Sequence, residues 1–222
     1  MVSRFPILVA ALVGLGGAAF AADIQLYETG PDVISGYVRF VNATGMAVEV
    51  AAGGATLALG TDDGARIGRF QAVPAGREQS ATLHVGDDRK PVTITAQPDE
   101  FITIAVLDGA EALVIRDIPQ DFNALKADIA FLNADPACAA GEMRAGARKT
   151  VVFKDVAPGA MARRLVNPVA AVIEASCGEV PVSGVVDLGT LAAGGRYSIL
   201  VLPDGQGGHR LIGGADARAK YD

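Results

Sequence analysis

The chain has 222 residues, a formal net charge of −6, and a composition that is 50% hydrophobic but only 5% aromatic, without tryptophan. The acidic balance argues against nucleic acid as a partner, because contacts with phosphate need clustered lysine and arginine side chains. Exposed aromatic side chains usually stack on sugar rings or bases, and this chain has few of them to offer. Binding of a polysaccharide is therefore a secondary expectation.

The first 21 residues have the pattern of a cleaved secretory signal. Arg4 is the only charge in this segment, an apolar stretch covers residues 7–20, and Ala19-Phe20-Ala21 supplies the small residues that a signal peptidase requires. The alternative is an N-terminal membrane anchor, but the apolar stretch is shorter than the roughly 20 residues that span a bilayer. We expect cleavage after Ala21 and export to an oxidising compartment. Loss of Arg4 would change the net charge from −6 to −7.

The first half of the mature chain is predicted to consist of short strands. In residues 38–42, apolar positions alternate and then run on continuously, as in a strand of a sandwich. Residues that favour turns, such as Asp62-Asp63-Gly64 and Pro74-Ala75-Gly76, separate the apolar stretches. The further strands predicted here cover residues 47–52, 65–71, 80–85, 92–95, 101–107 and 111–116.

The second half has the same character. Its predicted strands cover residues 127–133, 149–154, 163–166, 169–175, 182–186, 196–202 and 211–213. Seven or so short strands in about 90 residues are typical of a sandwich. We therefore predict an all-β fold with two tandem β-sandwich domains, immunoglobulin-like or jelly-roll-like, in residues 22–118 and 127–222, joined by a linker at residues 119–126. The nearest candidates for a local basic patch are Arg144, Arg148, Lys149 and Lys154, and the favoured alternative is an ordinary solvated surface.

Cys138 and Cys177 are the two cysteines of the chain. Because exported proteins form and keep disulfides, we predict that these residues form one. The alternative is a redox or metal pair. It is less favoured, because the sequence has no Cys-x-x-Cys motif and no histidine near either cysteine that would complete a zinc site.

The chain also repeats itself weakly. Residues 36–43 match residues 127–134 through an apolar-x-Phe-apolar-Asn-Ala pattern, residues 70–76 match residues 153–159, and residues 101–107 match residues 197–202. A single match of this kind could arise by chance. Three matches in the same order indicate two copies of one domain.

No catalytic residue is predicted. His84 lies inside a predicted strand and His209 in a predicted turn after Gly207-Gly208, so neither is expected to act as a base. A serine nucleophile needs a tight turn such as Gly-x-Ser-x-Gly, and Ser183 in Val182-Ser183-Gly184 is interpreted as an ordinary strand or turn serine.

No metal or cofactor is predicted either. Asp62-Asp63 and Asp87-Asp88 lie in turn-like contexts, and neighbouring side chains diverge, whereas glycoside hydrolysis needs facing carboxylates. Neither pair has the spacing of a calcium loop. The glycine-rich residues 205–208 lack the following Lys-Ser/Thr and the helix of a phosphate-binding loop.

The start of the mature chain resembles the AlgF family of periplasmic alginate O-acetylation proteins. The residues that carry the resemblance are Leu26-Tyr27-Glu28, Pro31 and the stretch from Ser35 to Ala43. In that family an N-terminal Leu-Tyr is followed by a proline turn and a Val-Arg-x-x-Asn-Ala strand. The chain length, the signal and the two-sandwich layout are also similar to that family.

The resemblance implies a non-catalytic periplasmic adaptor that helps acetyl groups reach a secreted polysaccharide. Its expected partners are periplasmic acetyltransferases and a membrane exporter of the acetyl donor, and the polysaccharide itself is a further candidate. Arg39 and its flanking loops are the candidate partner surface, with an ordinary strand arginine as the alternative. Two other functions stay open: a polysaccharide-binding module and an enzyme that itself transfers acetyl groups.

Overall fold

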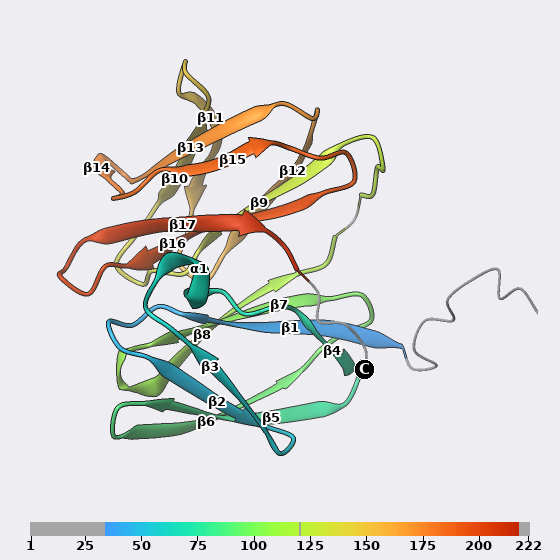
Figure 1. Ribbon diagram of the computed structural model, residues 1–222, viewed down its shortest axis with the longest axis vertical. Coiled ribbons are helices and arrows are strands. Elements are labelled where there is room, and N and C mark those ends of the chain that lie inside the picture. Colours follow the sequence, from blue (N-terminus) through green and yellow to red (C-terminus); the bar gives the residue numbers. More distant parts are fainter. Residues whose placement is uncertain (1–33, 120, 218–222) are drawn as a thin grey trace, which may run out of the picture. The chain divides into compact units, whose positions relative to one another are not determined.

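The computed structural model describes residues 34–119 and 121–217, and the predicted signal at residues 1–21 lies outside them (Figure 1). Nearly all regular structure in these residues is β, which confirms the all-β prediction. The helical elements there are α1 (Asp63–Arg66) and the 3-10 turn η1 (Asp108–Ala110). Within the described ranges, no helix has the length and apolar character needed to cross a membrane.

Two four-stranded sheets build the first half. One has the order β4-β1-β7-β8 and the other the order β3-β2-β5-β6. β1 and β7 run parallel, whereas the other neighbours in these two sheets are antiparallel (Figure 1). The strands are β1 (Ser35–Asn42), β2 (Val48–Ala52), β3 (Ala55–Leu59), β4 (Gln71–Pro74), β5 (Glu78–Val85), β6 (Asp88–Thr95), β7 (Phe101–Leu107) and β8 (Glu111–Asp117).

The second half repeats this arrangement. One sheet has the order β12-β9-β16-β17 with β9 and β16 parallel, and the other has the order β11-β10-β13-β14, with β15 also paired to β13. Its strands are β9 (Ala127–Asn133), β10 (Gly141–Ala145), β11 (Thr150–Val156), β12 (Met161–Val166), β13 (Ala170–Cys177), β14 (Val180–Pro181), β15 (Val186–Thr190), β16 (Arg196–Pro203) and β17 (His209–Ala215).

Two of the three sequence matches correspond to equivalent strands. β1 matches β9 and β7 matches β16, and the same hydrogen bond ends each parallel pair, from Ala43 N to Val106 O and from Ala134 N to Val201 O. The match of residues 70–76 with residues 153–159 is wrong. The first stretch contains β4, which pairs with β1, whereas the second contains part of β11, which pairs with β10.

The central strands are buried on both faces. In β1, Val38 belongs to a core cluster of the first half, whereas Val41 belongs to a cluster that both halves share. The strands β7, β9 and β16 are buried along most of their length. Because both faces of such a strand must be apolar, their sequences are nearly continuous apolar stretches. The shared cluster consists of Val41, Ala43, Ala105, Ile115, Ala130, Leu132, Ala134, Leu200, Leu202 and Ile212.

This shared cluster lies within a single compact unit, Val33–Asp222. The division into domains at residues 22–118 and 127–222, with a linker at 119–126, stays a prediction.

The predicted strand at residues 65–71 is wrong. The main-chain carbonyl of Asp62 accepts hydrogen bonds from the Ala65 and Arg66 N–H groups, which forms α1, and the strand begins only at Gln71. The buried Arg66 guanidinium then donates to the carbonyl oxygens of Asn42 and Thr44, at 3.0 and 2.8 Å. Pairing with β1 in this stretch is reduced to one bridge, between Ile67 and Val41, and the Arg66 side chain satisfies carbonyl groups at the end of β1.

The predicted strand at residues 182–186 is also wrong over most of its length, because β14 ends at Pro181 and β15 begins at Val186. Three short strands have no predicted counterpart: β3, β10 and β14. Of β4 and β15, only the first residue was predicted. β3 follows Gly53-Gly54, whose positive φ angles of 57° and 84° are those of a two-residue hairpin turn.

Candidate functional site

Three arginines and three aspartates gather where the two halves meet, and we call them the ionic cluster: Arg39, Asp117, Asp128, Arg163, Arg196 and Asp216. Arg163 pairs with both Asp117 and Asp128. Arg196 lies 3.7 Å from Asp117 and 3.6 Å from Asp128. The opposite charges balance, so the cluster can be buried without a net charge.

Arg39 connects the two halves through its whole guanidinium group. It donates from Nε to Thr103 Oγ1 at 3.0 Å, from Nη2 to Ser198 Oγ at 2.9 Å, and from Nη1 to Asp216 Oδ1 at 2.8 Å. Its planar group also lies 4.3 Å from the centre of the Phe70 ring. The guanidinium group is thus occupied by contacts within the protein, and the Arg39 side chain is 3% exposed.

The sequence suggested Arg39 and its flanking loops as a partner surface. In the structure Arg39 is buried, with an exposed fraction of 2%. The alternative interpretation, a strand arginine with a structural role, describes its position. Contact between Arg39 and a partner stays a prediction, and it would require the surroundings of this side chain to open.

Burial acts on the charges of the cluster. It lowers the pKa of Arg39, and the facing Asp216 carboxylate works against this effect. It also raises the pKa of Asp128, against the attraction of Arg163. Such a cluster is costly to build, and removal of one member leaves an opposite charge buried without its partner.

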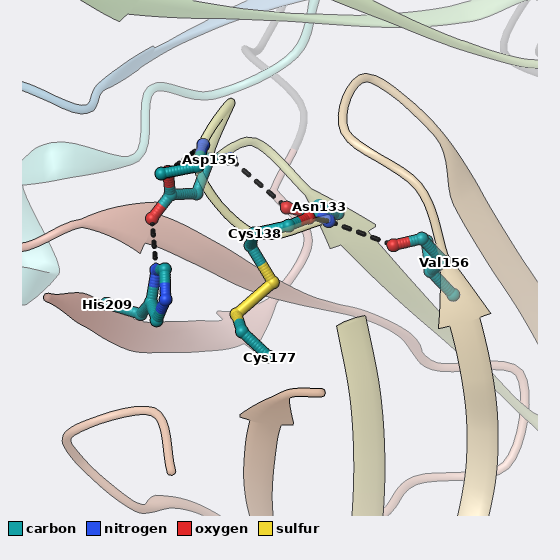
Figure 2. Close-up of a disulfide and its surroundings, with 7 residues drawn as sticks. Asn133, Asp135, Cys138, Val156, Cys177 and His209 are labelled. Carbon is teal, nitrogen blue, oxygen red and sulfur yellow. Dashed lines mark hydrogen bonds and ion pairs between the residues drawn. A yellow bond between two sulfur atoms is a disulfide. The ribbon is translucent and has the colours of Figure 1, made fainter. Parts of the chain in front are cut away.

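A second group surrounds the disulfide. The structure confirms the bond between Cys138 and Cys177, with a Cα–Cα distance of 5.1 Å. Figure 2 shows Asn133 next to it, donating from Nδ2 to the carbonyl oxygens of Cys138 at 2.7 Å and Val156 at 2.9 Å. The disulfide and Asn133 together fix the connection between β9 and β10 to the neighbouring strands.

The structure also brings together two residues that the sequence did not connect. His209 Nδ1 lies 2.7 Å from Asp135 Oδ2, and the Asp135 side chain is 1% exposed (Figure 2). The Ser183 hydroxyl donates to the His209 carbonyl oxygen at 2.7 Å rather than to the imidazole ring. His84 lies in β5, opposite Arg89 of β6.

The remaining candidates occupy turns and short elements. Asp63 begins α1, Asp88 begins β6, and Asp204 accepts hydrogen bonds from the N–H groups of Gln206 and Gly208 within the turn between β16 and β17. Among residues 34–119 and 121–217, no group of three or more histidine, cysteine, aspartate or glutamate side chains is arranged to hold a metal ion.

An exposed apolar segment borders the ionic cluster, and the sequence did not single it out. Phe122 is 84% exposed, Leu125 77% and Ile118 50%. A cleft of about 440 Å³ lies beside Ile118 and is lined by Arg163 and Arg164, among others. We call Ile118, Phe122, Leu125 and Arg164 the linker surface.

Hydrogen bonds hold the backbone at the C-terminal end of the linker surface. Asn123 accepts hydrogen bonds from the N–H groups of Leu125 at 2.9 Å and Lys126 at 3.0 Å. The Lys126 ammonium group donates to the Asn167 side chain just after β12, and the Lys126 carbonyl accepts from Gly194 N. These contacts fix residues 123–126, the part of the linker surface that carries Leu125.

No protein-family model and no curated protein matches this chain. The chain is similar in structure to the TIE protein of Bacillus anthracis, with 11% identity and a TM-score of 0.27 over 76% of this chain and 34% of that one. It is also similar to a candidate cell adhesion protein from Bacteroides ovatus ATCC 8483, with 8% identity and a TM-score of 0.26 over 87% of this chain and 100% of that one. The chain thus spans about a third of the length of the TIE protein, and neither likeness assigns it to a family or a function.

Proposed function

We propose that this chain is a non-catalytic periplasmic accessory protein for the O-acetylation of a secreted polysaccharide, and that it acts by binding the acetyltransferases of that pathway. The membrane exporter of the acetyl donor is its second partner. The pathway is proposed from the resemblance of residues 26–43, of which the part from Ser35 to Asn42 forms β1. The mode of action is proposed from the linker surface.

The linker surface has the composition of a protein-binding site. Phenylalanine and arginine are enriched in the buried centres of protein interfaces, and lysine and glutamate are depleted there. Phe122 and Leu125 expose most of their apolar area. Arg164 is exposed on β12 and lines the cleft beside Ile118. This surface is the observation that carries the proposal of a protein partner.

The ionic cluster is adjacent to the start of the linker surface. Asp117 is the last residue of β8 and precedes Ile118, and it pairs with Arg163 of β12. A binding surface is more effective when buried contacts hold it in place before the partner arrives, because less conformational entropy is lost on binding. The cluster therefore pre-organises the start of the linker surface.

The O-acetyl content of the secreted polysaccharide tests the proposed role. It is measured in a strain that lacks this gene, in the parent strain, and in the deletion strain carrying the gene again. We expect the acetyl content to fall in the deletion strain and to return on complementation. Unchanged acetylation would contradict the proposal and favour the polysaccharide-binding module, which calorimetric titration with the polymer would then examine.

A further inference from the structure

The first half contains a hollow between its two sheets. The cavity has a volume of about 420 Å³, which lies in the range of sites that bind small molecules. Large aliphatic and aromatic side chains from both sheets line it. They include Val38, Phe40, Leu57, Val73, Val92 and Ile94.

The second half closes the same space with side chains. Phe40 of β1 corresponds to Phe131 of β9, which is fully buried and stacks on Phe153 with a centroid distance of 6.4 Å. Phe40 has no such neighbour in the aromatic contacts of the described residues, and it is only partly buried at the cavity wall.

The buried core is continuous in the second half and divided in the first. The second half has one continuous cluster, which includes the disulfide, whereas the first half has two clusters. Phe40 and Val92 contact both of these clusters from the cavity wall. Side chains beside an empty space lose their dispersion contacts on one side, so an apolar ligand would restore contacts that the first half lacks.

Polar groups gather on the lining of the cavity. Arg69 and Gln71 are exposed, and Gln79 is partly exposed. Within the described part of the chain, no carboxylate forms an ion pair with Arg69. A guanidinium without a carboxylate partner beside an apolar hollow favours a ligand with an apolar tail and a negative head.

We propose that this cavity binds a single-chain amphiphile with an anionic head group, its alkyl chain between the sheets and its head group at Arg69. The tail would contact Phe40, Val92 and Ile94, and the amides of Gln71 and Gln79 would donate further hydrogen bonds to the head. This ligand is independent of the proposed role in acetylation. Either proposal can fail while the other holds.

Calorimetric titration of the mature protein with decanoate tests the site, with native mass spectrometry to count bound molecules. Decyl phosphate distinguishes a requirement for carboxylate from a requirement for any anion, and decyltrimethylammonium tests the sign of the charge. We expect one decanoate to bind per chain and decyltrimethylammonium to bind at least fivefold more weakly. Absence of decanoate binding, or equal affinity for the cation, would overturn the proposal.

Two variants locate the ligand. Arg69→Gln removes the charge at the head-group position, and we expect about fivefold weaker decanoate binding, the effect of one exposed ion pair. Ala81→Phe adds a ring to the lining of the cavity and should abolish binding. The control is Arg89→Gln, since Arg89 is exposed and does not line the cavity. Should Ala81→Phe fail to fold, Arg69→Gln decides alone: an affinity equal to that of Arg89→Gln would contradict the site.

Discussion

Arg39 has no charged counterpart in the second half, although the strands around it repeat. Its counterpart in the second half is Ala130, whereas Thr103 and Ser198 correspond to each other, because they lie opposite Arg39 on β7 and opposite Ala130 on β16. The guanidinium bonds both hydroxyl groups. The small Ala130 leaves room for one arginine to serve both halves.

Replacement of Arg39 should be strongly destabilising. In Arg39→Met, Asp216 loses its ion pair while its side chain stays about as buried, and both hydroxyl groups lose a donor. We expect the free energy of unfolding to fall by about 3–5 kcal/mol, measured by urea denaturation. Arg89→Met, at an exposed position, should change it by less than about 0.5 kcal/mol. Equal effects of the two substitutions would show that the ionic cluster does not join the halves.

A double-mutant cycle separates the ion pair from the packing. If the loss in Arg39→Met comes from the unpaired Asp216 carboxylate, adding Asp216→Asn should recover part of it, and the coupling energy should exceed about 0.5 kcal/mol. Strict additivity of the two substitutions would assign the loss to the hydroxyl contacts and to the stacking on Phe70.

Asp204 should titrate below its ordinary range. The N–H groups of Gln206 and Gly208 donate to its carboxylate and lower its pKa, since they bond the charged form. A lowered pKa in the folded state means that the contribution to stability is present above the unfolded pKa and is lost as pH falls through the folded value. Carboxyl carbon chemical shifts followed from neutral to acid pH would measure this pKa. A value at or above that of a model peptide would contradict the hydrogen bonds.

At the scale of elements, two asparagines end equivalent strands, and the side-chain amide of each donates to two carbonyl oxygens. Asn42 donates from Nδ2 to the carbonyl oxygens of Met46 at 2.7 Å and Gly60 at 2.8 Å, as Asn133 does to those of Cys138 and Val156. The Asn-Ala match in the sequence was therefore a match of structural roles. The sequence indicated the repeat but not the contacts that maintain it.

Loss of Asn42 should affect the first half directly. In Asn42→Ala the Gly60 carbonyl loses the amide donor and the Met46 carbonyl keeps only the Thr44 hydroxyl, so we expect a loss of about 1–3 kcal/mol in the free energy of unfolding. Chemical denaturation followed by circular dichroism would measure it. A substitution of the exposed Asn167 to alanine is the matched control, and an equally small effect of both would contradict the role of Asn42.

The disulfide should contribute to stability in the same range. Cys138 and Cys177 are separated by 39 positions, and their bond restricts the unfolded chain. We expect the Cys138→Ala/Cys177→Ala double variant to lose about 2–5 kcal/mol. Thermal unfolding of the oxidised and reduced wild-type protein gives an independent measurement. Identical melting temperatures would show that the bond adds nothing to the stability of the fold.

Local sequence patterns predicted most strands, and their failures have physical causes. β7 and β9 were predicted with their observed bounds, because each is a continuous apolar stretch between turn residues. Residues 65–71 were predicted as a strand, yet the buried contacts of Arg66 with the end of β1 favour a helical turn at their start. β3 and β10 are short and depend on their neighbours more than on their own composition.

At the scale of the whole molecule, the sequence predicted the two-sandwich fold but not the contact between the sandwiches. The continuous apolar sequences of β9 and β16 indicated burial on both faces, since a strand with one solvated face would alternate apolar and polar residues. The charges of the ionic cluster are spread from Arg39 to Asp216, and no local pattern connects them. The linker surface was missed for a related reason: residues 119–126 were predicted as a linker, and apolar residues in a linker give no periodic pattern.

The most direct test of the account is the O-acetyl content of the polysaccharide in a deletion strain complemented with a linker-surface variant, Phe122→Ser/Leu125→Ser. The matched control carries Val180→Ser, at an exposed apolar residue of β14, and both proteins are quantified in the periplasm. We predict that the control restores acetylation and that the linker-surface variant, present at an equal level, does not. Full restoration of acetylation by the linker-surface variant would contradict the proposal that this surface binds the acetyltransferases.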